Sequence, residues 1–317
     1  MFVLQDRTRT PERRASHTAE FMAVFRALES CRPVGERLFL DPYAKDFVRP
    51  SLRVAVWLAR NSLMGSLIRR FIDSRWPGAR SSGVARTRLI DDAVVAALTA
   101  GYRQIVLLGA GFDARAYRLA GIDAARVFEV DQAGTMAAKR EVLRSRGKDT
   151  AKHVTFVQVD FERDDLQQAL ISAGFRTDAR AVFVWEGVTN YLTAEAVDAT
   201  LRSIAGLSTA GSRLLFTYVH RGIIDGSTMF PQTDALVATL RSVGEPWTFG
   251  LDPSEAGAYL AARGFKLLMD HGARDYRSRY LGEPGQGYEF YRAAMAQRCD
   301  TDPVSDAGRE GDAACPK

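Results

Sequence analysis

Glycine and carboxylate residues follow short apolar runs in the middle of the chain. The stretch VLLGAGFDARAYRL (106–119) passes from aliphatic residues into Gly109 and Gly111, and Ala114 completes a G-x-G-x-x-G/A pattern. Glycines without a Cβ let the backbone approach a ligand closely. Asp131 ends the next apolar run, where a carboxylate can accept hydrogen bonds from ribose hydroxyls. These two features predict a site for a nucleotide-type cofactor.

Two further carboxylates distinguish between cofactors. Asp160 and Glu186 end the next two apolar runs, so the expected site has an acidic rim. The rim suits S-adenosylmethionine, which carries a cationic sulfonium, whereas it would repel the pyrophosphate of NAD. No Arg or Lys precedes Arg115 in the turn to offset that repulsion. Each carboxylate is alternatively an N-cap of the helix that follows it. The rim favours S-adenosylmethionine, with NAD as the alternative.

A helix before the turn carries an arginine of interest. In GVARTRLIDDAVVAALTAG (83–101) the apolar residues recur at helical spacing, which predicts an amphipathic helix ending near Gly101. Arg86 falls on the buried face of this helix. Arg88 lies about 200° around the helix from Arg86. We expect it to pair with Asp92, four residues later, on the solvent side.

The inward direction of Arg86 requires an anionic partner, because an unpaired buried charge is costly. One partner is a nearby carboxylate such as Asp113. The other is the carboxylate of a bound amino-acid moiety, which S-adenosylmethionine has and NAD lacks. We favour the ligand carboxylate.

The elements that must position these residues alternate from residue 104 onward. Short apolar runs alternate with amphipathic stretches, which is typical of a parallel sheet with crossover helices. The expected strands are 104–109, 126–131, 154–160, 181–187, 213–219, 265–270 and 288–295. We therefore predict an α/β fold with a Rossmann-like sheet of seven strands and helices on both faces. The carboxyl ends of its parallel strands would bring the turn and the carboxylates together.

The remaining parts of the chain differ from this core. The stretches before it are helix-like, Gly and Pro accumulate between the fifth and sixth expected strands, and the final segment is small and polar. The predicted parts are an N-terminal helical extension or cap over 1–80, a core over 81–296 with a lid insertion at about 222–250, and a disordered tail over 297–317.

The basic character of the chain is concentrated at its N-terminus. The net charge is +5, and residues 1–80 hold 15 Arg and Lys against 8 Asp and Glu, so the remainder is nearly neutral. There is no dense basic run with interleaved aromatic residues, and we expect no nucleic-acid partner. The arginines of the helix-like stretch 52–72 do not form one clean polar face. A cap packed on the core is therefore favoured over contact with an anionic membrane.

Composition excludes several other classes. No stretch reaches the roughly 18 apolar residues of a membrane span, and the opening MFVLQDRTRTPERR lacks the apolar segment of a secretory leader. We expect a cytoplasmic protein without a membrane span. Cys31, Cys299 and Cys315 have no metal-type spacing, so neither a zinc site nor a disulfide framework is expected.

Five motifs in order resemble a known family. They are ARTRLID (85–91), VLLGAGFDARAYRL (106–119), VFEVDQAGTMAAKREVL (127–143), VQVDF (157–161) and WEGVTNYLT (185–193). Together they resemble the leucine carboxyl methyltransferases, which are class I S-adenosylmethionine-dependent enzymes with many bacterial members. The resemblance covers nearly all of residues 17–296. The substrate-facing segments depart from those of the eukaryotic members, so their protein-phosphatase substrate is not carried over.

The resemblance implies a set of cofactor-binding residues: Arg86, Gly109, Ala110, Gly111, Asp113, Asp131, Gln132, Asp160, Phe161 and Glu186. Arg86 would hold the methionine carboxylate, and Glu186 would lie near the methionine amino group. Asp131 would bind the ribose hydroxyls, while Asp160 and Phe161 would contact the adenine. In this family Asp113 and Arg115 share a motif that supports the glycine loop.

The methyl acceptor determines whether a base is needed. Transfer from a sulfonium is an in-line displacement that depends mainly on positioning, and it requires no metal. A carboxylate acceptor is already ionised at pH 7. A phenol or alcohol would use a base, and the candidates are His220, Tyr191 and Tyr218. For His220, a structural hydrogen bond at a strand end is the simpler interpretation.

The sequence therefore predicts an O-methyltransferase. It would use S-adenosylmethionine, release S-adenosylhomocysteine, and methylate a carboxylate or hydroxyl of a small organic molecule, in bacterial secondary metabolism. The alternatives are an NAD-dependent dehydrogenase and a non-catalytic regulatory protein that binds the cofactor. The oligomeric state is left open.

Overall fold

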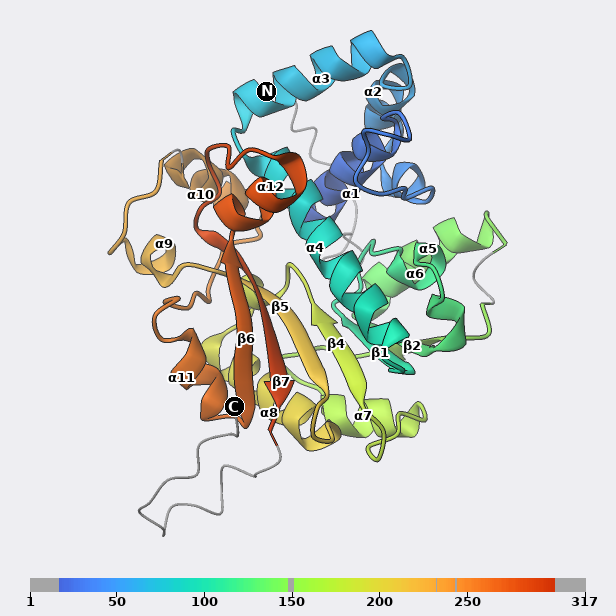
Figure 1. The fold of residues 1–317 in the computed structure, drawn as a ribbon, viewed down its shortest axis with the longest axis vertical. Coiled ribbons are helices and arrows are strands. Elements are labelled where there is room, and N and C mark those ends of the chain that lie inside the picture. The colour runs from blue at the N-terminus through green and yellow to red at the C-terminus, as the bar shows by residue number, and fades with distance from the viewer. Residues whose placement is uncertain (1–16, 148–150, 232, 243, 300–317) are drawn as a thin grey trace.

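A computed structural model describes residues 17–147, 151–231, 233–242 and 244–299 (Figure 1). Most of the tail predicted to be disordered, 297–317, lies outside the described residues. Its first residues belong to the last strand, which extends to Arg298. Within the described residues no helix is long and apolar enough to cross a membrane.

A seven-stranded sheet forms the centre of the molecule (Figure 1). Its strands are β1 (Gln104–Leu108), β2 (Arg126–Asp131), β3 (Val154–Gln158), β4 (Ala181–Trp185), β5 (Arg213–Val219), β6 (Phe265–Gly272) and β7 (Tyr291–Arg298). They lie in the order β3-β2-β1-β4-β5-β7-β6. All neighbours are parallel except β7, which is antiparallel to both β5 and β6. The predicted α/β fold with seven strands is confirmed.

The last strand begins later than predicted. Tyr288, the first residue of the predicted strand, has φ of +64°, a conformation that non-glycine residues rarely adopt. Its carbonyl accepts a hydrogen bond from the Tyr291 amide at 3.0 Å. This turn delays the extended conformation, and β7 starts at Tyr291.

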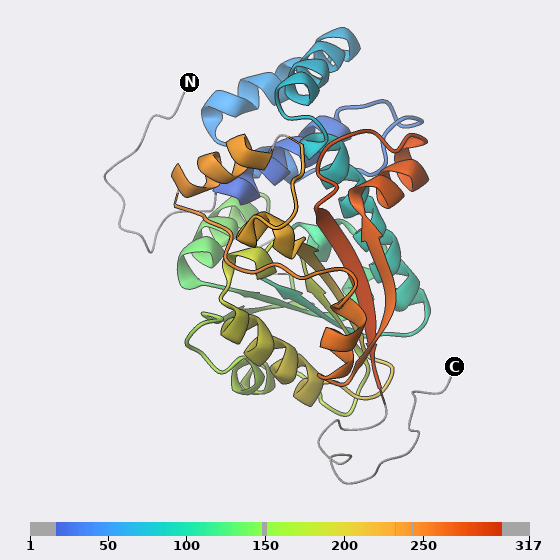
Figure 2. The ribbon, with the colours of Figure 1, turned by 90° about the vertical axis from the view of Figure 1, so that its left-hand side faces the viewer.

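Helices cover both faces of the sheet (Figures 1 and 2). The α-helices are α1 (His17–Ser30), α2 (Pro50–Leu58), α3 (Ser62–Arg75), α4 (Ala79–Thr99), α5 (Arg115–Arg118), α6 (Ala133–Arg144), α7 (Leu166–Ser172), α8 (Ala194–Leu207), α9 (Arg221–Asp225), α10 (Thr233–Ser242), α11 (Ala256–Ala261) and α12 (Ala273–Leu281). Three 3-10 turns are η2 (Ala44–Phe47), η3 (Ile122–Ala124) and η4 (Thr189–Tyr191).

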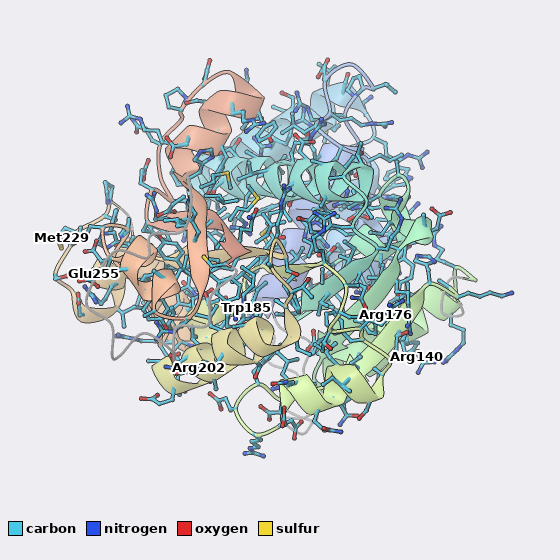
Figure 3. The ribbon with its side chains drawn as sticks, turned by 60° about the horizontal axis from the view of Figure 1, so that its bottom comes forward. Arg140, Arg176, Trp185, Arg202, Met229 and Glu255 are labelled. Atoms are coloured by element: carbon cyan, nitrogen blue, oxygen red, sulfur yellow. The ribbon has the colours of Figure 1, made fainter. Side chains whose placement is uncertain are left out.

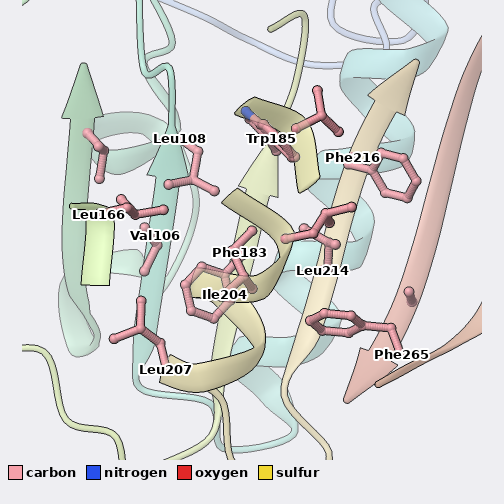
Figure 4. Close-up of a cluster of buried hydrophobic side chains, with 14 of the residues drawn as sticks. Val106, Leu108, Leu166, Phe183, Trp185, Ile204, Leu207, Leu214, Phe216 and Phe265 are labelled. Atoms are coloured by element: carbon pink, nitrogen blue, oxygen red, sulfur yellow. The ribbon is translucent and has the colours of Figure 1, made fainter. Parts of the chain in front are cut away.

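Alternation along the strands builds an apolar layer on each side of the sheet. Val106 and Leu108 pack with Ile204 of α8 in one layer, which Figure 4 shows. Ile105 and Leu107 pack toward α4 in the other. All of these side chains are buried, and burial of each contributes about 1.5–3 kcal/mol. This two-sided core holds the strand ends in fixed positions.

The N-terminal helices lie at one end of this core, beyond the sheet (Figure 1). The expected single stretch 52–72 is broken into α2 and α3, because the Asn61 side chain accepts hydrogen bonds from the amides of Leu63 and Met64 and so begins a new helix. The insertion at 222–250 contains α9 and α10. The Thr18 hydroxyl of α1 donates a hydrogen bond to Glu245 of this insertion at 2.6 Å. The N-terminal extension and the insertion are therefore in contact.

Candidate cofactor and acceptor site

The sheet order brings the predicted carboxylates to one edge. Gly109 follows β1, Asp131 ends β2 and Glu186 follows β4, and β1 lies between β2 and β4. The chain order reverses on either side of β1, where open α/β sheets bind ligands.

The two glycines of the turn serve different purposes. Gly109 has φ of +63°, and a Cβ there would lie 2.3 Å from Cγ2 of Val188. Gly111 has φ of +40°, and the atoms nearest to a Cβ there would be the Gly109 carbonyl oxygen at 3.7 Å and Cβ of Ala19 in α1 at 3.9 Å. Gly109 is therefore needed for packing against Val188, whereas the backbone at Gly111 has room for a ligand.

Asp131 closes the turn from the end of β2. Its two carboxylate oxygens accept hydrogen bonds from the amides of Gly111 at 2.5 Å and Gln132 at 2.7 Å. Burial raises the pKa of Asp131, and these two hydrogen bonds oppose the shift. Each oxygen keeps a second lone pair that can accept a ribose hydroxyl. With Gly111, Met136 and Phe156, Asp131 lines a crevice that is too narrow for a water molecule.

Arg86 is buried, as the helical spacing predicts, at 5% exposure. Its Nε donates to Glu186 Oε1 at 2.9 Å, and its guanidinium lies 4.3 Å from the centre of the Tyr291 ring. Its Nη2 contacts only the sulfur of Met22, at 3.7 Å. A thioether is a weak acceptor, so a ligand carboxylate would displace it. The anionic partner of Arg86 in the structure is thus a protein carboxylate, as the alternative expected, but it is Glu186, because Asp113 pairs with Arg115. On the solvent side, the predicted pair between Arg88 and Asp92 is confirmed at 2.7 Å.

Arg115 is the centre of an ion-pair network that sequence reasoning missed. Its guanidinium contacts Asp91 at 2.7 Å, Asp113 at 2.6 Å and Glu186 at 2.7 Å, and its side chain is 3% exposed. Sequence analysis expected only loop support from Arg115. Asp91 was the available signal, because an acid within the apolar face of the helix at 83–101 requires a buried cation.

The network continues from α4 into the N-terminal helices. Arg118 contacts Asp91 at 2.7 Å and Asp41 at 3.7 Å, and Asp41 pairs with Arg26 at 2.9 Å. Arg26 also donates to the carbonyl of Phe112 in the glycine turn at 2.6 Å. The extension before the core is thereby tied to the cofactor loop.

The charges of this network balance. It consists of four arginines and four carboxylates: Arg26, Arg86, Arg115, Arg118, Asp41, Asp91, Asp113 and Glu186. Beneath it, Lys139 and Glu129 form a separate buried pair at 2.9 Å. Asp131, at the edge of the sheet, forms none of the ion pairs found among the described residues, although the nearby charge of Lys139 favours its ionised form. A ligand with a carboxylate, an ammonium and a sulfonium carries one net positive charge and complements it.

Asp160 and Phe161 follow β3. Asp160 accepts a hydrogen bond from the Glu162 amide at 3.0 Å, so it caps a turn, whereas Asp165 is the N-cap of α7. The ring of Phe161 lies 6.3 Å from that of Trp185 at the end of β4. The residue before them is held at the end of β2, because the Val159 amide donates to the Asp131 carbonyl at 3.0 Å.

Two candidate bases are engaged in structural contacts. Tyr218 is fully buried, and its hydroxyl donates a hydrogen bond to Asp270 Oδ2 at 2.6 Å. Burial, and after it the interaction with Asp270, raises the pKa of Tyr218 far above its ordinary value. Nδ1 of His220 accepts a hydrogen bond from the Gly222 amide at 3.0 Å and caps α9. This contact is the structural hydrogen bond at a strand end that the simpler interpretation of His220 expected.

The third candidate, Tyr191, ends η4 and lies near Thr18 of α1 and Trp247 of the insertion. Burial raises its pKa to about 12. At neutral pH its phenol therefore keeps its proton and can donate it in a hydrogen bond.

Aromatic side chains gather under the insertion. The ring of Phe290 lies 5.8 Å from Phe230, 5.7 Å from Trp247 and 5.0 Å from Tyr288. We call these four residues the aromatic cluster. Its members come from the insertion and from the segment before β7.

Asn190 is a second feature that sequence reasoning missed. It is fully buried, and neither polar atom of its carboxamide has a hydrogen-bond partner among the described residues. The main-chain carbonyl of Asn190, in contrast, accepts a hydrogen bond from the Thr248 amide at 2.8 Å, which ties η4 to the end of the insertion. An unpaired buried amide costs about 1–3 kcal/mol, so a ligand partner is expected.

A mixed sheet of seven strands with helices on both faces is the α/β fold of class I S-adenosylmethionine-dependent methyltransferases. The chain resembles the structure described as "a putative methyltransferase" from Thermobifida fusca YX, with a TM-score of 0.55 and 16% identity over 89% of this chain and 97% of that one. A DUF574 family protein from Streptomyces avermitilis has the same TM-score at 14% identity, over 90% and 99% of the two chains. These two similarities concern the fold.

The family follows from sequence comparison. The model of the family "Leucine carboxyl methyltransferase" matches residues 19–205, and the chain belongs to this family. A Mycolicibacterium gilvum protein named "Putative S-adenosyl-L-methionine-dependent methyltransferase" is 40% identical over 66% of this chain and 67% of its own length. A protein of the same name from Mycolicibacterium paratuberculosis is 32% identical over 86% and 90% of the two chains. The protein is thus a methyltransferase that uses S-adenosylmethionine, and the NAD alternative is not supported.

Proposed function

We propose that this protein transfers the methyl group to a carboxylate oxygen of a small organic acid with an apolar body. The observation that carries the proposal is that none of the three candidate bases is available to accept a proton. Tyr218 donates its proton to Asp270, Tyr191 holds its proton until pH about 12, and Nδ1 of His220 is occupied. A carboxylate is ionised at pH 7 and needs none of them.

The hydrogen bond at His220 argues against its use as a base. Because Nδ1 accepts from the Gly222 amide, the neutral ring carries its proton on Nε2. Neither nitrogen then has a free lone pair for a proton from an alcohol or phenol. This tautomer is assigned from the hydrogen-bond partner.

Neutral donors on the acceptor side suit an anionic acceptor. The Tyr191 hydroxyl and the Asn190 amide can both donate hydrogen bonds to a carboxylate, and neither would lose a proton at neutral pH. The aromatic cluster supports an apolar substrate body, because its rings offer large apolar surfaces beside these donors.

We assign the cofactor contacts to the residues predicted from the sequence. When bound, S-adenosylmethionine supplies an electrophilic methyl group on a sulfonium. Arg86 would bind its carboxylate, Asp131 its ribose hydroxyls, and Glu186 would lie beside its amino group. Gly109, Ala110, Gly111, Asp113, Gln132, Asp160 and Phe161 complete the proposed cofactor site. The chain's part in catalysis is to align the acceptor oxygen and to exclude water.

We also propose the wider setting predicted from the sequence. Residues 1–80 and 222–250 would form a cap and a lid over the core of residues 81–296, supported by the hydrogen bond from Thr18 to Glu245. The protein would act in the cytoplasm on a small molecule rather than on nucleic acid. A role in bacterial secondary metabolism stays a prediction.

The test is a methylation assay with paired acceptors. Purified protein is incubated with S-adenosylmethionine labelled in the methyl group and with aromatic or aliphatic carboxylic acids, each beside the phenol or alcohol of the same skeleton. Methyl esters release labelled methanol in mild alkali, whereas methyl ethers do not. We expect alkali-labile product from acids; product stable to alkali, formed from phenols alone, would contradict the proposal and favour a hydroxyl acceptor.

A further inference from the structure

The second and third helices expose an unusual number of large apolar side chains. Half of the fourteen that are exposed among the described residues fall within residues 54–76, on α2, α3 and the Trp that follows. They are Val54, Trp57, Leu63, Met64, Leu67, Phe71 and Trp76, which we call the apolar arm. Scattered apolar residues are common on surfaces, whereas a contiguous group marks an interaction site.

Helix α3 has apolar residues on both its inner and its outer side. Gly65 is buried and Ile72 packs on the N-terminal core cluster. Leu63, Leu67 and Phe71 follow each other at intervals of four residues, so they share the outer face, where they are 57–75% exposed. The stretch packs on the core through its inner side, as expected, and its outer face stays exposed.

Positive charge surrounds these apolar residues. Arg53, Arg60, Arg70 and Arg75 are exposed, and Arg75 lies over the Trp76 ring at 5.6 Å. The single acid between residues 50 and 76 is Asp73, which pairs with Arg80 at 2.6 Å. The arm thus combines tryptophan, aliphatic residues and uncompensated arginine.

We propose that the apolar arm docks on the surface of an anionic lipid bilayer. Tryptophan prefers the interface between lipid and water, and arginine reaches anionic headgroups while its stem covers apolar surface. The apolar residues enter the boundary of the acyl chains, and the arginines bind the lipid phosphates.

The same charges disfavour a second copy of the chain as the partner. A symmetric contact between two arms would bring the four exposed arginines of each copy together without an exposed acid to pair with them. The geometry also favours lying on the bilayer rather than crossing it. Helix α3 has 14 residues and is about 21 Å long, against a hydrocarbon core of about 30 Å.

Figures 1 and 2 place α2 and α3 at one end of the molecule, beyond the sheet. Arg176 and Arg202 lie at the opposite end, which comes forward in Figure 3. This arrangement lets the arm meet a flat surface without obstruction from the sheet. It also offers matched control residues far from the arm.

The experiment is co-sedimentation of the full chain with two kinds of vesicle. One kind is phosphatidylcholine alone, and the other contains phosphatidylglycerol in addition. We expect binding to the anionic vesicles, decreasing with added salt, and at least about tenfold weaker binding to the neutral ones. Equal binding to both kinds, or binding to neither, would overturn the proposal.

Two pairs of double variants locate the contact. Trp57→Ser with Phe71→Ser should weaken binding to anionic vesicles at least about tenfold, whereas Ile171→Ser with Leu268→Ser, which removes two exposed apolar residues elsewhere, should not. Arg60→Gln with Arg70→Gln should weaken it about tenfold, unlike Arg176→Gln with Arg202→Gln. Circular dichroism and binding of S-adenosylhomocysteine verify that every variant is folded. Equal losses in the arm and control variants would overturn the assignment. So would a lipid-free dimer that the Trp57 and Phe71 variant abolishes, because the arm would then bind a second copy.

Discussion

The two halves of the site satisfy their polar groups in opposite ways. On the cofactor side, four arginines and four carboxylates form one continuous network, and Asp131 is held by backbone amides. On the proposed acceptor side, the Asn190 carboxamide is buried and has no hydrogen-bond partner among the described residues. Because a buried unpaired group is costly, the cofactor side is largely preorganised, whereas the acceptor side completes its hydrogen bonds only with a ligand.

This difference indicates that the cofactor side contributes more to the stability of the fold, and the acceptor side more to substrate specificity. Breaking the network should destabilise the fold, since each removed cation leaves carboxylates buried and unpaired. Changing the acceptor side should instead affect activity more than folding. The predictions below test that separation, beginning with the largest effect.

Arg115→Met should lower the free energy of unfolding by about 3–5 kcal/mol, because Asp91, Asp113 and Glu186 would lose their shared cation. Urea denaturation measures the change. The control is Arg202→Met, which removes an exposed arginine paired with Asp198 and should change the free energy of unfolding far less, because water screens that pair. Equal costs for the two variants would show that the network is not the structural centre of the cofactor side.

Asp113→Asn should sharpen the comparison through pH. Burial opposes ionisation of Asp113, but Arg115, Lys139 and Arg118 outweigh it and lower its pKa from 3.8 to about 2. The ionised group therefore contributes stability above pH 3.8, about 2 kcal/mol, which is lost as the pH falls toward 2. The free-energy difference between the parent and the variant should shrink over that range in urea titrations. A difference that stays constant with pH would contradict the assigned role of the charge.

Asp131→Asn should weaken binding of S-adenosylhomocysteine about 10- to 100-fold, since hydrogen bonds to a charged group contribute about 1.5–3 kcal/mol. The melting temperature should also fall somewhat, because the carboxamide of asparagine has one acceptor oxygen for the two amides of Gly111 and Gln132. Calorimetric titration measures the affinity, with Asp123→Asn, an exposed acid outside the site, as the control. Unchanged affinity would remove Asp131 from the proposed cofactor site.

Asn190→Leu should separate stability from activity on the acceptor side. Removal of the unpaired carboxamide should raise the free energy of unfolding by about 1 kcal/mol, while kcat/KM for the acceptor should fall about tenfold. Affinity for S-adenosylhomocysteine should stay at the parental value. If the variant were stabilised and fully active, Asn190 would have no part in acceptor binding.

Much of the fold was predictable because its signals are local. The seven apolar runs predicted all seven strands, and helical spacing predicted the burial of Arg86 and the pair between Arg88 and Asp92. The start of β7 was missed because the positive φ of Tyr288 is not encoded by residue type. The outer face of α3 was missed for a related reason, since apolar spacing does not reveal which face finds a partner.

The sequence by itself determined which residues lie at the strand ends and which face of each helix is apolar, because backbone geometry fixes those periods. Only the tertiary structure decided the partners. Arg86 meets Glu186 across 100 residues, Arg115 meets Glu186 across 71, and Val188 occupies the space beside Gly109. These contacts depend on β4 lying next to β1, and strand order is set by the packing of the whole sheet rather than by any local pattern.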